Sequence, residues 1–395
     1  MLVIRNIGEL FLGDGRSIRN ASLRIENGRI LDFGAKGDEF LDARGGAVIP
    51  GLIDSHTHLV FAGNRSEEFV MRAKGMSYLE IANAGGGIWR TVEAVRKASL
   101  EELVERALPR LARMLSYGVT TVEVKSGYGL TVEDEVKMLL AVRKLRELQP
   151  IELVSTYLAA HTLPPEYRDR REAYVDLVVS DELMGWVVAE GLAEFVDVFC
   201  EESAFTVEES RRILEAGKKR GLAPRIHADQ ITQMGASRLA AEVGCVSADH
   251  LERIDEGGIA ALRSAGVIAG LLPGCSFYLG VPQAPARRLL DSGVPVAFAT
   301  NYNPGSSMVE SLPLALSIAC TQMKVTPSEA LVGATATAAA AVLREKRLGR
   351  IEKGMEADLV LLDVPSVDQW LSEMGRSSVR TVLKRGRVVH ESPRG

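Results

Sequence analysis

Five of the six histidines in the chain stand at or just after the ends of short apolar segments that resemble buried strands. His56 and His58 lie in "DSHTHL", His161 ends "STYLAAH", and His227 and His250 lie in "RIHA" and "SADH". Neutral imidazole is a good ligand for zinc or iron, and it exchanges protons near neutral pH. One such histidine is usually a hydrogen-bonded core residue, but the recurrence at several strand ends indicates a metal-dependent active site.

The strongest local signal is the pair in "DSHTHL". Residues i and i+2 of a strand point to the same face, so His56 and His58 can both reach one ion. An HxH pair alone is equally consistent with a packing pair. Three protein ligands and a water are the usual arrangement of a catalytic zinc site, which makes His227 the natural third ligand. His250 is then a candidate acid or base beside the water.

The segments that must position these histidines alternate along the middle of the chain with amphipathic helical stretches. Eight of them, mostly followed by a helix, predict an α/β fold of the (β/α)8 TIM-barrel type, whose active site lies at the carboxyl ends of the strands. A doubly wound open sheet is the alternative, but no GxGxxG follows the first strand. The predicted strands are "GLIDSH", "VTTVEVK", "ELVSTYLAAH", "FVDVFCE", "APRIHA", "CVSADH", "GVIAGLLPG" and "VPVAFATN".

The sequence pattern at both ends of the chain differs from that of the middle. They contain short apolar runs separated by Asp-Gly, Asn-Gly and similar turn signals, which are typical of antiparallel strands. We therefore predict a small β-sandwich domain composed of residues 1–48 and 345–395, with the barrel in residues 49–344.

Composition narrows the functional class. The net charge of −5 is mixed along the chain, so no nucleic-acid footprint is expected. No uninterrupted apolar run reaches about 18 residues, so no membrane partner is expected either. The four cysteines form no CxxC pair, and the start of the chain lacks the pattern of a signal peptide. These features favour a cytoplasmic enzyme acting on a small molecule.

Several stretches resemble the amidohydrolase superfamily and, within it, the imidazolonepropionase family. The resemblance covers nearly the whole predicted barrel, and the terminal "GRIEKGMEADLVLLD" resembles the β domain of the superfamily. It implies hydrolysis of the ring amide C–N bond of 4-imidazolone-5-propanoate to N-formimidoyl-L-glutamate, in histidine degradation. It also implies a homodimer. The stretches are "GLIDSHTHLVFAGNRSEEF", "MSYLEIANAGGGI", "TTVEVKSGYGL", "LAAHTLPPEY", "IHADQ", "SADHL", "LLPGCSFYLG" and "NYNPGSS".

The resemblance also implies roles for individual residues. Relatives with two metals commonly bridge them with a carboxylated lysine on the fourth strand, and "FVDVFCEES" has no lysine, so one zinc or iron ion is expected. The implied metal ligands are His56, His58, His227 and Asn301. The implied catalytic residues are His250, Asn301 and His161, the last as a stabiliser of the oxyanion. The implied substrate contacts are Arg65, which matches the propanoate carboxylate, and Tyr78, Tyr128, His161, Gln230, Asn303, Gly305 and Ser306.

Asn301 departs from the family pattern, which has an aspartate at this position before Asn-Pro-Gly. An amide is a weaker ligand and cannot accept the proton of the nucleophilic water, and loss of a positioned base costs about 10²–10⁴-fold in rate. Three interpretations remain: a substituted residue in an active scaffold, a base that has moved to His250, or a metal-dependent binding protein without turnover. Within the fold, a purine or pyrimidine deaminase is the rival enzyme; it would expel ammonia and need no arginine for a propanoate.

The glycine run "NAGGGI", with Gly85, Gly86 and Gly87, raises the question of a phosphate-binding loop. It lacks the Lys-Ser/Thr of a P-loop, so we expect a loop near the mouth of the barrel.

Overall fold

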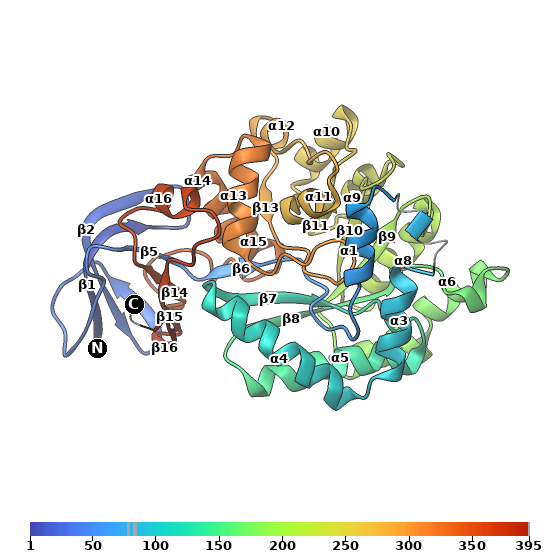
Figure 1. The fold of residues 1–395 in the computed structure, drawn as a ribbon, viewed down its shortest axis with the longest axis horizontal. Helices are drawn as coiled ribbons and strands as arrows, with labels where there is room; N and C mark the ends of the chain where they lie inside the picture. The colour runs from blue at the N-terminus through green and yellow to red at the C-terminus, as the bar shows by residue number, and fades with distance from the viewer. Residues whose placement is uncertain (77–79, 82–84, 394–395) are drawn as a thin grey trace.

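The structure, a computed structural model, describes residues 1–76, 80–81 and 85–393. Two sheets of eight strands each organise this part of the chain. Figure 1 shows the terminal strands at one end of the molecule and the barrel with its helices at the other. The prediction of a (β/α)8 barrel with a small β domain built from both termini is confirmed.

The barrel strands are parallel and follow one another in space in the order of the sequence. Every residue of β7 is buried, as expected for a strand covered by helices outside and side chains inside. Each of the eight segments predicted as a strand contains one of them. They are β6 (Leu52–Asp54), β7 (Val119–Lys125), β8 (Glu152–Ala160), β9 (Phe195–Cys200), β10 (Ala223–Ala228), β11 (Ser247–His250), β12 (Ile268–Leu271) and β13 (Val296–Phe298).

The barrel closes through side chains and single bridges between the ends of β6 and β13. The carboxylate of Asp54 accepts hydrogen bonds from the backbone N–H of Thr300 at 3.0 Å and from its hydroxyl at 2.6 Å. Beyond the strands, Thr57 forms a parallel bridge with Tyr302, and the N–H of His58 donates to the carbonyl of Tyr302 at 3.0 Å. The HxH segment is thereby fixed against the segment that carries Asn301.

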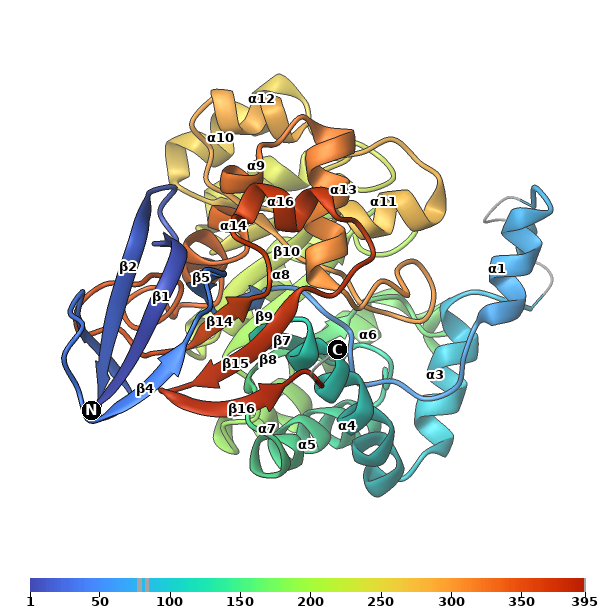
Figure 2. The ribbon, with the colours of Figure 1, turned by 60° about the vertical axis from the view of Figure 1, so that its left-hand side comes forward.

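Helices surround the barrel strands (Figures 1 and 2). Ser99 and Glu102 form a capping box at the start of α4, which buries Leu103, Ala107 and Leu111. Among the described residues, no helix combines the length and apolarity needed to cross a bilayer. The helices are α1 (Ser66–Ala73), α3 (Ile88–Lys97), α4 (Leu100–Ser116), α5 (Val132–Leu148), α6 (Arg171–Val179), α7 (Trp186–Ala189), α8 (Val207–Lys219), α9 (Ala236–Val243), α10 (Glu256–Ala265), α11 (Pro273–Leu279), α12 (Ala286–Asp291), α13 (Leu312–Met323), α14 (Pro327–Gly333), α15 (Ala336–Ala341) and α16 (Val367–Ser372), with a 3-10 turn at Pro165–Tyr167 and a π turn at Asp181–Gly185.

The terminal sheet joins the two ends of the chain through the antiparallel pairing of β5 with β14. Its order is β16-β15-β14-β5-β1-β2-β3, with β4 paired to β1, and it packs on a core of its own that includes Ile4, Leu23 and Leu361. In Figure 2 the C-terminal strands lie beside the N-terminal ones. The boundaries 1–48 and 345–395 stay a prediction. The strands are β1 (Leu2–Phe11), β2 (Ser17–Glu26), β3 (Arg29–Asp32), β4 (Glu39–Asp42), β5 (Ala47–Pro50), β14 (Leu359–Leu362), β15 (Val379–Lys384) and β16 (Arg387–Glu391).

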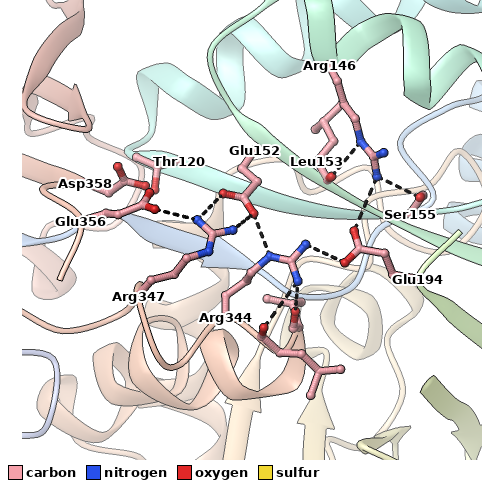
Figure 3. Close-up of polar contacts among 12 residues, drawn as sticks. Thr120, Arg146, Glu152, Leu153, Ser155, Glu194, Arg344, Arg347, Glu356 and Asp358 are labelled. Atoms are coloured by element: carbon pink, nitrogen blue, oxygen red, sulfur yellow. Dashed lines mark hydrogen bonds and ion pairs between the residues drawn. The ribbon is translucent and has the colours of Figure 1, made fainter. Parts of the chain in front are cut away.

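An ion-pair network centred on Glu152 ties the start of β8 to the C-terminal part of the chain (Figure 3). The carboxylate of Glu152 accepts from Arg344 Nε at 2.8 Å and from Arg347 Nη1 at 2.9 Å. Lys384 Nζ, from the terminal sheet, lies 3.8 Å from the same carboxylate. Burial alone would raise the pKa of Glu152, but the hydrogen bonds from Arg347 and Arg344 lower it to about 2.

Because of this network, the free energy of unfolding depends on pH in the acidic range. Because the folded-state pKa of Glu152 is depressed, its contribution is fully present above about pH 4.5, the ordinary value for glutamate, and is lost as pH falls toward 2. We expect Glu152→Gln to lower the thermal midpoint by about 2–4 °C at pH 7 and to have almost no effect near pH 2, measured by calorimetry across this range. Glu147→Gln, at the exposed pair with Lys144, is the control. A difference between Glu152→Gln and the native chain that does not change with pH would contradict the account.

Candidate active site

Three histidines converge at the carboxyl-terminal mouth of the barrel. His56 and His58 follow β6, and His227 lies on β10; all three are at most 3% exposed. One ligand atom from each lies within 4.8 Å of the other two, which suits a single ion. Burial lowers the pKa of His56 and of His58 well below the ordinary value, so both rings stay neutral with lone pairs available.

Two buried carboxylates, neither of them predicted as a site residue, orient the histidine rings. Asp249 Oδ2 lies 2.7 Å from Nδ1 of His56, and Asp197 Oδ2 lies 3.1 Å from Nδ1 of His227. The opposite nitrogens, Nε2 of His56 and of His227, are buried and have no partner among the described residues. A carboxylate on one ring nitrogen and an open lone pair on the other is the usual state of a metal-binding histidine. The residues present therefore fit a zinc or iron ion.

The same carboxylates belong to a layer of buried charges below the histidines. Arg225 donates to Asp249 at 2.9 Å, while Lys125 donates to Asp197 at 2.8 Å and to Glu123 at 2.9 Å. All five side chains are at most 1% exposed. Buried charges persist only where they are paired and hydrogen-bonded, so this layer fixes the geometry of the site from below.

The packing around Asp249 also explains one glycine. A Cβ on Gly270 of β12 would lie 2.1 Å from Oδ1 of Asp249, so no side chain fits there.

Two signals in the sequence could have pointed to the orienting carboxylates. Both are polar residues inside apolar strands, Asp197 in "FVDVFC" and Asp249 immediately before His250 in "SADH".

Asn301 lies immediately beyond β13, in contact with the first ligand segment. Its backbone N–H donates to the carbonyl of His56 at 3.0 Å, and its φ of 53° is in the left-handed region that asparagine tolerates. Its side chain is 2% exposed, and its Oδ1 has no partner among the described residues. The amide oxygen is thus a buried acceptor without a partner among the described residues, on a segment that contacts His56, and its role as a ligand stays a prediction.

His250, at the end of β11, faces the same cluster. Its ring centroid lies 5.3 Å from that of His227 and 5.7 Å from that of His56. Its φ of 83° is a strained value for a residue with a side chain, and such strain recurs at functional sites. Nδ1 lies 3.5 Å from Oε1 of the buried Glu252. The geometry is suited to a proton acceptor next to the ion site.

His161 and Tyr128 form one wall beside the cluster. The ring of His161 stacks on that of His58 with centroids 4.8 Å apart, and Tyr128 lies 5.4 Å from His161. His161 Nδ1 lies 3.0 Å from the carbonyl of Gly127, which can only accept, so Nδ1 carries the proton. Burial lowers the pKa of His161 to about 3, so the ring is neutral and Nε2 is an acceptor.

The loop after β13 packs against Arg65. Asn303 Oδ1 accepts from the N–H groups of Gly305 and Ser306, both at 2.8 Å, and Asn303 Nδ2 donates to the carbonyl of Asn301 at 2.7 Å. Arg65, only 8% exposed, lies so close to Gly305 that a Cβ there would be 2.0 Å from Nη1. The structure thus brings four of the predicted substrate contacts, including Arg65 and Ser306, to the segment that carries Asn301.

Gln230, another predicted contact, is not tied to the histidine cluster by a hydrogen bond among the described residues. Gln230 is half-buried in the loop after β10, where Glu201 accepts from the N–H groups of Ile231 at 2.9 Å and Thr232 at 3.2 Å. Tyr78 lies outside the described residues. The roles of all these residues stay predictions.

Comparisons with known proteins identify the family. The amidohydrolase family model matches residues 47–389. An imidazolonepropionase from Geobacillus kaustophilus is 49% identical over 94% of this chain and 90% of its own length, and one from Anaeromyxobacter dehalogenans is 50% identical over 96% and 93%. The chain belongs to the imidazolonepropionases of the amidohydrolase family. It is therefore a hydrolase, and the resemblance seen in the sequence is confirmed.

Solved structures show the same fold in more distant proteins. A 5-methylcytosine deaminase from Klebsiella pneumoniae matches with a TM-score of 0.78 and 16% identity over 100% of this chain and 99% of its own. A zinc-bound adenosine deaminase from Xanthomonas campestris matches with a TM-score of 0.75 and 18% identity, covering 98% and 92%. At these identities the likeness concerns the fold alone.

The carboxylate pairs make a prediction about metal affinity. Asp249→Asn removes the charge that orients His56, and we expect zinc to bind the metal-free chain about 10–100-fold more weakly, measured by competition with a chromophoric chelator. Asp358→Asn, which alters a buried carboxylate paired with Lys384 in the terminal sheet, is the matched control. Equal zinc affinity of Asp249→Asn and the native chain would contradict the orienting role.

Proposed function

We propose that the chain hydrolyses the ring amide C–N bond of 4-imidazolone-5-propanoate to N-formimidoyl-L-glutamate. The observation that carries the proposal is the convergence of three buried histidines, with Arg65 and the loop of Asn303, at one mouth of the barrel. Relatives about half identical over nearly the whole chain, which bear the name imidazolonepropionase, support it. The proposal includes one zinc or iron ion, a cytoplasmic location and a homodimer, which rest on composition and family resemblance.

The chain's own residues would hold the substrate from three sides. The guanidinium of Arg65 receives the propanoate carboxylate. Tyr128 donates a hydrogen bond to the substrate, and Gln230 reads a polar atom of the ring. The sequence suggested that His161 stabilises the oxyanion, but its proton lies on Nδ1 toward the carbonyl of Gly127. We therefore assign His161 Nε2 as the acceptor of a ring N–H.

His56, His58 and His227 would hold the ion, with the amide oxygen of Asn301 beside them. The bound ion would supply Lewis-acid activation of water and of the ring carbonyl.

His250 is the base in this proposal. Asn301 cannot accept a proton, whereas the imidazole of His250 lies beside the cluster, with Oε1 of Glu252 3.5 Å from its Nδ1. As water attacks the carbonyl carbon, one water proton passes to His250 and a C–O bond forms. The C–N bond then breaks, and the departing ring nitrogen takes the proton from His250.

The amide at position 301 should limit the rate. We expect Asn301→Asp to raise kcat about 10²-fold or more at equal ion content, because a carboxylate is a stronger ligand and a second base, and His250→Gln to lower kcat of the native chain about 10²-fold. Steady-state and single-turnover hydrolysis of imidazolonepropanoate measure both effects, with bound ion counted.

Asn64→Asp, an exposed change of amide to acid near α1, is the matched control and should leave kcat unchanged. If kcat of Asn301→Asp is no higher at equal ion content, the amide at position 301 does not limit the rate, and this prediction is wrong. If neither chain opens the ring, the proposed function is wrong, and release of ammonia from a purine or pyrimidine would favour the deaminase.

A further inference from the structure

Glu68, on the first turn of α1, is buried directly against Arg65. It is 1% exposed, and its two oxygens accept from Arg65 Nε at 2.9 Å and from Arg65 Nη2 at 2.7 Å. Two parallel hydrogen bonds of this kind fix the plane of a guanidinium as well as its position. Glu68 therefore decides which way Arg65 points.

The pairing leaves one nitrogen of Arg65 for other partners. Nη1 has no hydrogen bond among the described residues, and it is the atom against Gly305, where a Cβ would approach to 2.0 Å. The guanidinium is thus held between Glu68 on one side and the loop after β13 on the other. Nη1 is directed to the side where that loop also carries Asn303 and Ser306.

Glu68 also organises the glycine run of the sequence. Oε1 accepts from the N–H of Gly87 at 2.9 Å. A Cβ on Gly86 would lie 3.2 Å from the carboxyl carbon of Glu68 and 2.8 Å from the carbonyl oxygen of Ile81. Glycine is therefore needed at position 86 because the backbone passes over this carboxylate, which is a structural reason that involves no phosphate.

A second arginine completes the charge balance of this group. Arg72 Nη1 lies 4.0 Å from Oε2 of Glu68, and its guanidinium lies 5.2 Å from the ring centroid of Tyr278. Burial opposes ionisation of Glu68, but the hydrogen bonds of Arg65 keep its pKa below the ordinary value. Arg65, Arg72 and Glu68 together carry a net charge of +1, which the carboxylate of one bound ligand would neutralise.

We propose that Glu68 is a positioning residue that aims Arg65 at the substrate and thereby makes the site selective for ligands bearing a carboxylate. The inference rests on the proposed function in one respect, the assignment of the propanoate to Arg65. It makes a counterintuitive prediction: removing a negative charge near an anion site should weaken anion binding, because lost orientation outweighs the relief of repulsion.

Equilibrium binding tests the proposal without catalysis. Imidazole-4-propanoate has no ring carbonyl to attack, and imidazole-4-propanamide differs from it only in the carboxylate. By titration calorimetry on the zinc-loaded chain, we expect Glu68→Gln to weaken the propanoate about 10-fold and to leave the propanamide unchanged. In turnover, KM should rise about 10-fold with kcat within a factor of two. Glu67→Gln, at the exposed neighbour paired with Arg90, is the matched control.

The alternatives give different results. Tighter or unchanged binding of the propanoate by Glu68→Gln would overturn the proposal, as would an equal loss for both ligands, which indicates a structural role only. If Glu68→Gln does not fold, Gly305→Ala displaces the same guanidinium from its other side and should show the same selective loss; no selectivity change there would also overturn it.

Failure of the proposed function is a separate outcome. A native chain that prefers the propanoate, loses this preference in Glu68→Gln and yet opens no imidazolone ring would support the positioning role and contradict the proposed reaction. A native chain with no preference for the propanoate would overturn the positioning role itself.

Discussion

The site depends on two buried hydrogen bonds, which Nδ1 of His56 donates to Asp249 and Nδ1 of His227 donates to Asp197. Each fixes which ring nitrogen carries a proton and which keeps its lone pair, and so decides whether the two histidines can meet one ion. Without the carboxylate, the histidine ring could rotate and its proton could move to the other nitrogen, so the lone pair would not stay directed at the ion. The carboxylates can be buried only because Arg225 and Lys125 pair with them in the interior of the barrel.

A second constraint acts from the edge of the site. The segment after β6 and the segment after β13 are far apart in sequence, yet they are joined by hydrogen bonds that close the barrel. One more hydrogen bond, from the N–H of Asn301 to the carbonyl of His56, connects Asn301 directly to the segment that carries the predicted ligands. Because this contact uses only the backbone N–H of residue 301, exchanging the amide side chain for a carboxylate would alter the charge without removing the bond.

The fold was readable from the sequence because its signals are local. "VTTVEVK" is a continuous buried strand, and the histidines follow such strands, so a barrel with chemistry at its mouth could be predicted. The carboxylate partners could not be predicted. Asp249 lies on β11 and His56 follows β6, so closure of the barrel brings them together and their spacing in the sequence does not reveal it. The pairing of Glu68 with Arg65 is visible only in the structure, where Gly86 packs against Glu68 and Gly305 against Arg65 so closely that neither position has room for a side chain.

In the proposed reaction, one ion held by His56, His58 and His227 enables this chain to open the imidazolone ring. The most direct test adds zinc in steps to the metal-free chain with imidazolonepropanoate present, counting bound zinc and identifying the product by NMR. We expect ring opening to rise in proportion to bound zinc, to saturate at one ion per chain and to yield N-formimidoyl-L-glutamate without ammonia. A chain that is fully loaded and binds the substrate but forms no product, or that needs a second ion, would contradict it.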